Sequence, residues 1–299
     1  MAVSNNPILI IGYGEVGHAM EYLLAARYPL QFWDIRPVAG HAPVELEQAA
    51  AQAGCVIYCV PVTPLGEVAE RVRPHLSADS ISFTVAKGLD AAGRPAPAIF
   101  SDVYAGAHDY GVLYGPMIAE EIMQGRPAFA QVGCSRPEVF AGIEALFQGS
   151  GLILRYSDDI QGIAWSSVLK NVYAILFGAA DELALGDNVR GFLAVAAIGE
   201  MASIVQAMGG NSATVIQLAG LGDLVTTATS SSSHHHELGR QLARGEYRGG
   251  PAEGVHTLAM VEQFGLLDRE HYPLFSLVAQ IVSEQSGIEQ RIRRYLQLL

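Results

Sequence analysis

A single lysine interrupts a long apolar segment of the sequence. Lys170 is the only formally charged residue between Ile160 and Ala180, and Leu169 and Val172 lie close beside it. A lysine that is removed from water has a lowered pKa and can exchange a proton near neutral pH. We therefore expect Lys170 to protonate a carbonyl oxygen while a hydride reaches the carbonyl carbon. The alternative is a structural lysine whose ammonium group reaches solvent from a helix end.

Two further charged residues stand where a ligand would bind. Lys87 follows a strand-like segment, at the carboxyl edge of a sheet where ligands bind in α/β folds. Asp223 lies among small residues in "LAGLGDLVTT", and a carboxylate there can pair with Lys170. The loop "GPMIAEE", which ends another strand-like segment with a Gly-Pro turn, is also expected to face a ligand. A solvated surface charge is an equally good interpretation of Lys87 and Asp223.

The segment "ILIIGYGEVGHAM" has the spacing of a dinucleotide-binding loop. Gly12 permits the tight turn, Gly14 lets the backbone approach a pyrophosphate, and Gly17 allows close packing of helix on strand. The helix that starts near Glu15 and Val16 offers free N–H groups to an anion. Because the loop follows an apolar strand and opens a helix, we prefer this interpretation to an ordinary glycine turn.

An acidic residue follows the loop at the end of the next expected strand. Asp34 comes 20 residues after Gly14 and can accept hydrogen bonds from both ribose hydroxyls. A carboxylate there repels a 2′-phosphate, although Arg36 lies two residues on and softens that preference. The sequence therefore predicts NAD as the cofactor, with NADP as the alternative.

Two different patterns divide the chain. In the first half, short apolar runs alternate with helical stretches, which predicts parallel βαβ units in a doubly wound α/β sheet of the Rossmann type. From about Asp158 onward, apolar residues recur at helical spacing. We predict a dinucleotide-binding domain at 1–157 and an all-helical substrate and catalytic domain at 158–299. Strands are expected at 8–11, 30–34, 55–60, 80–86, 110–115, 128–133 and 152–156, and helices of the second domain at 160–180, 189–208, 254–265 and 273–286.

The composition of the 299 residues limits the class of protein. Half of them are hydrophobic and 16% are charged, as in a packed globular protein with a large core. The net charge of −12 argues against a nucleic-acid binder, but a few local cations can still hold a small anionic ligand. We expect no membrane span, because Lys170 would lie at the bilayer centre if Ile160–Ala180 crossed a membrane.

The cysteines and the first residues of the sequence indicate a cytoplasmic protein. Cys55 and Cys59 share an expected strand and would lie about 13 Å apart, too far for a disulfide. Cys134 is the third cysteine, so the count is odd. The segment "MAVSNNPILIIGYGEVG" lacks the basic and apolar regions of a signal peptide.

Taken in order, these segments resemble the NAD(P)-dependent glycerol-3-phosphate dehydrogenases of the bacterial type. The resemblance rests on "GYGEVG", "VPVTPLGEV", "AKGLD", "GPMIAEE", "LKNVYAILFGAADELALGDN", "LAGLGDLVTT" and "PAEGVHT", which cover nearly the whole chain. It implies a Rossmann domain followed by an all-helical domain, a homodimer and a role in glycerophospholipid metabolism. The implied reaction is reversible hydride transfer between the nicotinamide and dihydroxyacetone phosphate.

The resemblance also implies roles for individual residues. Lys170 is similar to the family's catalytic proton donor and acceptor, Asn171 follows it as expected, and Lys87 is similar to the lysine that touches cofactor and substrate. Asp223 and Thr227 match the family's active-site aspartate and threonine. The other matches are Gly115 and Ala119 at binding positions and Glu253 at an acidic residue near the cofactor, whereas Met117 stands where serine is usual.

The segment "SSSSHHHELG" (230–239) departs from the resemblance. The family carries Ser-Arg-Asn-Arg where this chain has Ser233, His234, His235 and His236. His234 and His235 replace the residues that hold the substrate phosphate and approach the cofactor, so we interpret the segment as an anion pocket with changed recognition residues. Losing the charged, two-pronged contact of an arginine costs about 1.5–3 kcal/mol in binding.

Other interpretations of the histidines are weaker. A tag would lie at a terminus, adjacent histidines on a helix point in different directions and hold a metal poorly, and a solvated polar loop is the remaining alternative. We therefore predict no metal. If phosphate still binds, backbone N–H groups and Ser230–Ser233 hold it, or Arg240, Arg244 and Arg248 compensate from downstream.

Three functions stay open from the sequence. The leading hypothesis is an NAD-dependent dehydrogenase of glycerol 3-phosphate. The second is a reductase of another small oxo compound, such as a carboxylate, because Lys170 and Asp223 remain while the phosphate residues are changed. The third is a dinucleotide-binding redox sensor without turnover, which has no need of a buried lysine.

Overall fold

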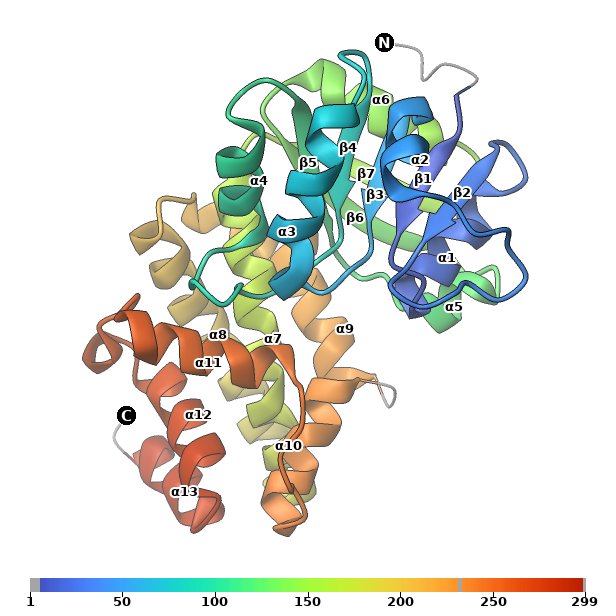
Figure 1. Ribbon diagram of the computed structural model, residues 1–299. Helices are drawn as coiled ribbons and strands as arrows, with labels where there is room; N and C mark the ends of the chain where they lie inside the picture. The colour runs from blue at the N-terminus through green and yellow to red at the C-terminus, as the bar shows by residue number, and fades with distance from the viewer. Residues whose placement is uncertain (1–5, 231–232, 298–299) are drawn as a thin grey trace.

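A seven-stranded sheet occupies one part of the protein and a body of helices the other (Figure 1). The computed structural model describes residues 6–230 and 233–297. The strands lie in the order β2-β1-β3-β4-β5-β6-β7. Their bounds are β1 (Ile8–Ile11), β2 (Leu30–Trp33), β3 (Cys55–Tyr58), β4 (Ile81–Thr84), β5 (Asp109–Tyr114), β6 (Ala128–Cys134) and β7 (Leu152–Ser157). The predicted Rossmann-type sheet followed by helices is confirmed.

One pair of neighbouring strands is antiparallel. β6 runs against β5, with Val112 opposite Gly133, whereas every other pair in the sheet is parallel. The expectation of parallel units throughout the first half is therefore wrong for β6. The connection explains the reversal: α5 (Ala119–Met123) is a five-residue helix of about 7.5 Å. It is too short to carry the chain back along β5, whose six residues extend about 20 Å.

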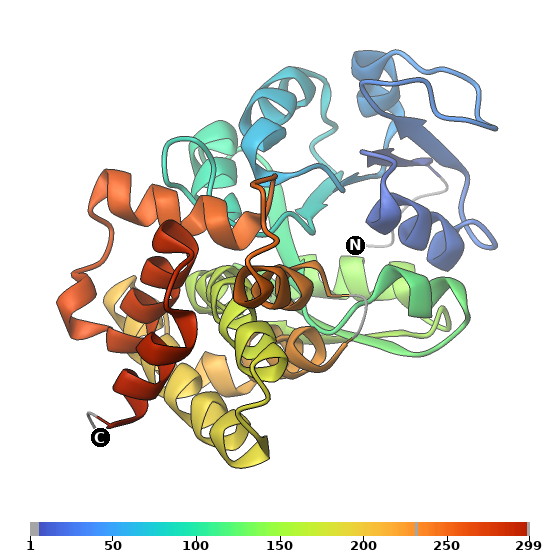
Figure 2. The ribbon, with the colours of Figure 1, turned by 90° about the horizontal axis from the view of Figure 1, so that it is seen from below.

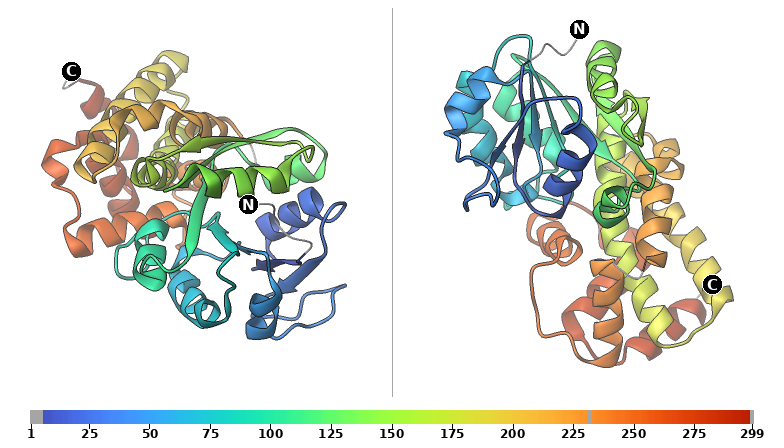
Figure 3. Two further views of the ribbon diagram at one scale, coloured as in Figure 1. Left: turned by 90° about the horizontal axis from the view of Figure 1, so that it is seen from above. Right: turned by 90° about the vertical axis from the view of Figure 1, so that its right-hand side faces the viewer.

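Helices cover both faces of the sheet (Figure 3). In β1, Ile8 and Ile10 pack into the layer that contains α1 and α6, while Leu9 and Ile11 pack into the layer of α2, α3 and α4. Because both faces are buried, the central strands read as continuous apolar runs. The helices of this part are α1 (Glu15–Leu24), α2 (Leu46–Gln52), α3 (Val62–Val72), α4 (Ala96–Tyr104) and α6 (Pro137–Phe147).

A long helix, α7 (Ile160–Glu182), forms the centre of the helical body. All residues from Gly162 to Ala180 are buried, and the other helices gather around α7 (Figure 2). A helix that is apolar on all sides needs such an enclosure. The surrounding helices are α8 (Asp187–Ala207), α9 (Asp223–Thr229), α10 (His234–Arg244), α11 (Glu253–Phe264), α12 (Pro273–Glu284) and α13 (Ile288–Gln297).

Three of these helices are absent from the expected set, namely α9, α10 and α13. α10 buries only Leu238, Gly239 and Leu242, and α13 only Ile288 and Ile292. Both are short and mostly polar, so they lack the long apolar run that marks α7 and α8 in the sequence. The predicted helices near 160–180, 189–208, 254–265 and 273–286 correspond to α7, α8, α11 and α12.

Two helices, α7 and α8, are long and apolar enough to cross a membrane by length and composition alone. The most apolar window of α7 is entirely buried in the protein, which confirms the expected core helix. The corresponding window of α8 is only 28% buried, and Val195 on this helix is 74% exposed. The three cysteines are free thiols.

Candidate active site

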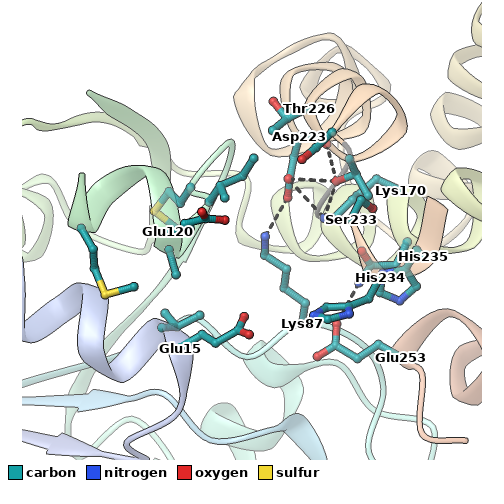
Figure 4. A pocket seen from close by; sticks show the side chains of 18 residues that line it. Glu15, Lys87, Glu120, Lys170, Asp223, Thr226, Ser233, His234, His235 and Glu253 are labelled. Atoms are coloured by element: carbon teal, nitrogen blue, oxygen red, sulfur yellow. Dashed lines mark hydrogen bonds and ion pairs between the residues drawn. The ribbon is translucent and has the colours of Figure 1, made fainter. Parts of the chain in front are cut away.

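Lys170, Lys87 and Asp223 meet in one cluster (Figure 4). Lys170 Nζ donates hydrogen bonds to Asp223 Oδ1 at 3.2 Å and to Thr227 Oγ1 at 2.9 Å. Lys87 Nζ donates to the other carboxylate oxygen, Oδ2, at 2.7 Å. The side chains of Lys170 and Asp223 are only 8% and 5% exposed. The structure therefore contains the expected Lys170–Asp223 pair, and neither residue is a solvated surface charge.

Three separate elements bring these side chains together. Lys170 lies at the middle of α7, Lys87 in the loop after β4, and Asp223 at the start of α9. A π-helical turn, Leu218–Gly222, leads directly into Asp223. Gly220 makes this wide turn possible, because a Cβ there would lie 2.1 Å from the backbone oxygen of Val215.

Lys87 and Lys170 are the only lysines in the sequence. Every other basic side chain apart from the histidines is an arginine, and arginines form the exposed ion pairs, such as Arg71–Glu47 and Arg293–Glu289. A buried lysine can release its proton near neutral pH, whereas arginine stays charged. The restriction of lysine to one cluster is a functional signal that the composition carries and that no single motif shows.

The charges of the cluster shift one another's proton affinities. Burial lowers the pKa of Lys170 to about 8, while Asp223 opposes this shift and Lys87 adds to it. Burial acts to raise the pKa of Asp223, but Lys170 and Lys87 hold it below its usual value. Both protonation states of Lys170 are therefore accessible near neutral pH, while Asp223 stays ionised.

The cluster lines a cavity of about 560 Å³, which we call the lysine pocket. Met117, Ala119 and Met123 from the segment around α5 form an apolar wall, as expected for a loop that faces a ligand. Glu15 and Glu120 lie across the pocket from His235 (Figure 4). The lining residues are Glu15, Val16, Lys87, Met117, Ile118, Ala119, Glu120, Met123, Lys170, Asn171, Asp223, Thr226, Thr227, Ser230, Ser233, His234, His235 and Glu253.

Asn171 and Glu253 mark the junction between the lysine pocket and a second cleft. Asn171 Nδ2 donates to Glu253 Oε2 at 2.9 Å. Burial raises the pKa of Glu253, against the influence of Lys87 and Lys170. Glu253 lines both cavities, so a ligand that extends from one into the other passes its carboxyl group.

The second cleft, of about 580 Å³, runs past the glycine loop. Gly12 has a φ of +93°, and a Cβ there would lie 2.8 Å from the backbone of Cys59. A Cβ at Gly17 would lie 2.3 Å from the oxygen of Gly12, whereas one at Gly14 would meet nothing within 4 Å. Gly14, Glu15 and Val16 line the cleft at the start of α1, where no side chain caps the helix. The loop therefore has both the space and the free N–H groups that a pyrophosphate needs.

Asp34 lies at the same cleft, just after β2. Its Oδ2 accepts a hydrogen bond from the Tyr13 N–H at 2.9 Å, and its Oδ1 accepts one from the Arg36 N–H at 3.1 Å. Both Asp34 and Arg36 line the cleft beside Trp33. These contacts fix the carboxylate where a ribose of a bound dinucleotide would lie.

The three histidines form the first turn of α10 and point to three different places. Ser233 caps the helix, since its Oγ accepts from the His236 N–H at 3.3 Å. His234 is exposed and lines the lysine pocket. His235 Nε2 accepts from the Gly254 N–H at 3.1 Å, and His236 Nε2 lies 2.7 Å from Asp181 Oδ2. The segment is therefore a helix start, and its described part is not a solvated polar loop.

A close helix crossing places this turn beside Lys170. A Cβ at Gly239 of α10 would lie 1.9 Å from the backbone oxygen of Ile175 in α7. A Cβ at Gly178 of α7 would likewise lie 1.9 Å from the oxygen of His236. Because neither glycine has a side chain, the two helices touch backbone to backbone. This contact sets the position of His234 and His235.

Several residues that were expected at the site lie outside the two cavities. A Cβ at Gly115 would lie 2.5 Å from the oxygen of Phe129, so this glycine packs on β6, and it lines neither cavity. Arg240 and Arg244 bind Glu182, and Arg248 binds the oxygen of Gly245. The expectation that these arginines compensate in the pocket is therefore wrong, because acidic neighbours and a backbone carbonyl hold them elsewhere. Ser231 and Ser232 lie outside the described residues.

Comparison with known proteins identifies the family. The profile described as "NAD-dependent glycerol-3-phosphate dehydrogenase C-terminus" matches residues 159–293, and the corresponding N-terminus profile matches residues 36–140. The chain is 31% identical to glycerol-3-phosphate dehydrogenase (NAD(P)+) of Agrobacterium fabrum, over 97% of this chain and 96% of that protein. The chain belongs to the NAD-dependent glycerol-3-phosphate dehydrogenase family.

Other family members extend the comparison. The glycerol-3-phosphate dehydrogenase (NAD(P)+) of Nitrosomonas eutropha is 28% identical over 97% of each chain. The crystal structure of glycerol-3-phosphate dehydrogenase from Coxiella burnetii shares the fold, with a TM-score of 0.86, 24% identity and coverage of 97% of this chain and 98% of that one. The N-terminus profile begins after the glycine loop, so the geometry around Gly12, Gly14 and Gly17 is a separate indication of a dinucleotide site.

Proposed function

We propose that this family member reduces dihydroxyacetone phosphate to glycerol 3-phosphate reversibly, with NAD(H) or NADP(H) as cofactor. The observation that carries the proposal is the placement of Lys170. Its buried ammonium group lies 3.2 Å from Asp223, in a pocket that shares Glu253 with the second cleft, which runs past the glycine loop. A redox sensor without turnover has no use for such a group, so we set that alternative aside.

The reaction needs a proton at the substrate oxygen. When bound, the dinucleotide supplies or accepts the hydride. In reduction, the Lys170 ammonium gives a proton from Nζ to the carbonyl oxygen; in oxidation, the neutral amine removes the hydroxyl proton. A pKa of about 8 suits both directions, because neither form of Lys170 is rare near neutral pH.

The neighbours of Lys170 orient it and balance its charge. Asp223 stabilises the ammonium form, and Thr227 Oγ1, which donates to the Asp223 backbone oxygen at 2.7 Å, accepts from Lys170. Lys87 lies on the other side of Asp223, where its ammonium can contact both substrate and cofactor. Asn171 and Ala119 line the substrate side, and Glu253 holds the Asn171 amide in place.

The assay that tests this proposal follows NADH or NADPH oxidation with dihydroxyacetone phosphate. We expect Lys170→Ala to lower kcat by about 10²–10⁴, the usual contribution of a general acid. Lys170→Arg keeps the positive charge but not a proton that can be exchanged near neutral pH, so it should lower kcat by a similar factor. Arg293→Ala, which removes an exposed cation on α13, is the matched control and should change kcat little.

The pH profile gives a second readout. Reduction needs the ammonium, so its rate should fall as the pH rises above about 8, whereas oxidation of glycerol 3-phosphate should rise over the same range. Absence of substrate-dependent turnover with either cofactor between pH 6 and 8 would contradict the proposed function.

We further propose that NAD is preferred over NADP. Asp34 supports this, because its carboxylate lines the cleft at the end of β2 and repels a 2′-phosphate. Asp34→Ala should raise kcat/KM with NADPH relative to NADH by roughly tenfold, equivalent to about 1.4 kcal/mol. Arg36→Ala should lower kcat/KM with NADPH only. An unchanged cofactor ratio in Asp34→Ala would contradict this assignment.

We propose a homodimer that buries the exposed face of α8. Gly191, Val195, Ile198, Gly199 and Ala202 recur at helical spacing on that face, and small residues allow close approach of a second copy. Sedimentation should give a dimer for the wild type and a monomer for Val195→Glu. Ile153→Glu, at a 52% exposed position on β7, is the matched control and should stay dimeric.

We also propose a cytoplasmic enzyme whose product, glycerol 3-phosphate, supplies glycerophospholipid synthesis. Three free thiols support a reducing compartment, and the net charge of −12 supports a small-molecule rather than a nucleic-acid partner. Cell fractionation should recover the protein with cytoplasmic markers.

A further inference from the structure

The two ammonium groups of the lysine pocket share one counterion. Among the described residues that line the pocket are two such groups, Lys87 and Lys170, and no arginine. Both are committed to one carboxylate, at 2.7 Å and 3.2 Å from Asp223. The positive charge of both lysines is therefore balanced by the Asp223 carboxylate, beside the first turn of α10.

Acidic side chains outnumber these two lysines in the same pocket. Glu15, Glu120, Asp223 and Glu253 all line it. Burial raises the pKa of Glu253, yet even with this group protonated three carboxylates face two ammonium groups. A dianion that enters such a pocket gains little from long-range attraction.

The start of α10 supplies no fixed cation either. His235 uses Nε2 to accept from the Gly254 N–H, and burial lowers its pKa to about 3, so the ring is neutral. The neighbouring arginines of this segment, Arg240 and Arg244, are bound to Glu182 and Glu237. His234 is left as the exposed side chain of this turn that lines the pocket and has room for a larger group.

We propose, on the basis of the function proposed above, that the pocket tolerates the substrate phosphate without selecting for it, and that position 234 sets this selectivity. The substrate class is a three-carbon hydroxyketone whose far end is either phosphorylated or uncharged. Dihydroxyacetone should be reduced with a kcat/KM within about tenfold of that for dihydroxyacetone phosphate, since no charged two-pronged contact rewards the phosphate.

The test compares both substrates with NADH in the wild type, His234→Arg and His271→Arg. His234→Arg should raise kcat/KM for the phosphorylated substrate by about ten- to hundredfold, through KM and not kcat, and leave dihydroxyacetone within about threefold. His271→Arg is the matched control, because His271 is 75% exposed and pairs with Asp268 far from the pocket. This variant should leave kcat/KM for both substrates unchanged.

The possible outcomes distinguish failure of this inference from failure of the proposed function. A wild-type preference for the phosphorylated substrate above tenfold, or a preference that His234→Arg does not increase, overturns the inference and leaves the dehydrogenase function standing. Turnover of dihydroxyacetone alone contradicts both the proposed physiological substrate and the inference, because the pocket would then exclude the phosphate. Turnover of neither substrate contradicts the proposed function itself.

Discussion

The two ends of the lysine pocket hold their polar side chains in opposite ways. At one end, Lys170, Lys87 and Asp223 carry charges, and Lys170 and Asp223 are nearly inaccessible to solvent. At the other end, His235 is neutral and bonded to a backbone N–H, while His234 is exposed. The first arrangement resists change because every charge depends on the others. In the second arrangement, each residue can be substituted without leaving a buried charge unpaired.

Under the proposed function, this difference separates proton transfer from substrate recognition within one cavity. Proton transfer by Lys170 uses a lowered pKa, and burial lowers it against the opposing effect of Asp223. Recognition of the far end of the substrate requires only groups of suitable size and charge at the first turn of α10. We therefore expect variants at the charged end to affect both stability and rate, and variants of the exposed His234 at the α10 end to affect mainly selectivity.

The largest effect is expected at Asp223. Asp223→Ala leaves two neighbouring ammonium groups without a counterion, so we expect a loss of about 3–5 kcal/mol in the free energy of unfolding and of most activity. Asp223→Asn keeps the shape but removes the negative charge that favours the ammonium form of Lys170. Its pH profile for reduction should therefore shift to lower pH.

The two lysines allow a direct measurement of this shift. With lysine as the only 15N-labelled residue type, the side chains of Lys87 and Lys170 give the only two ammonium signals of the chain. The pKa of Lys170 should be near 8 in the wild type and lower in Asp223→Asn. An equal or higher pKa in the variant would show that Asp223 does not act on Lys170 electrostatically.

A smaller effect is expected at His235, on stability and its pH dependence. The folded protein keeps this ring neutral down to about pH 3, whereas the unfolded chain protonates it near pH 6.5. The unfolded state thus binds more protons between these values, so His235 lowers stability as the pH falls from 6.5 to 3. The slope is at most about 1.4 kcal/mol per pH unit.

Two substitutions separate the contributions of His235. His235→Asn keeps an acceptor for the Gly254 N–H but does not titrate, so its urea stability should depend less on pH than that of the wild type. His235→Ala leaves the N–H without its partner and should cost about 1–3 kcal/mol at pH 7. Parallel pH dependences in the wild type and His235→Asn would exclude this role.

The smallest effect is expected at Met117 on the apolar wall. Met117→Ser adds a hydroxyl that can donate a neutral hydrogen bond to the substrate, worth about 0.5–1.5 kcal/mol, or a two- to twelvefold lower KM. Met117→Ala removes the thioether without adding a hydroxyl and is the matched control. If the two variants have the same KM, the wall does not contact the substrate.

The glycine loop, Lys170 and the positions of the strands were predictable from the sequence. Each depends on a local pattern: glycines at fixed spacing, one charge in an apolar helix, and short runs rich in β-branched residues. The reversal of β6 and the existence of α10 were not, because the reversal depends on a short connection and α10 is a short, mostly polar helix without an apolar run. The environment of Gly115 was also missed, since nothing near it in the sequence indicates contact with β6.

The sequence by itself determined the elements and the residue types available for chemistry. Only the tertiary structure decided which of them meet. Asp223 contacts Lys87, 136 positions away, and Lys170, 53 positions away, while His235 contacts Gly254 and the downstream arginines bind acidic side chains of α7 and α10. Hydrogen bonds and ion pairs act over a few ångströms in space, whereas sequence patterns report only the spacing along one element.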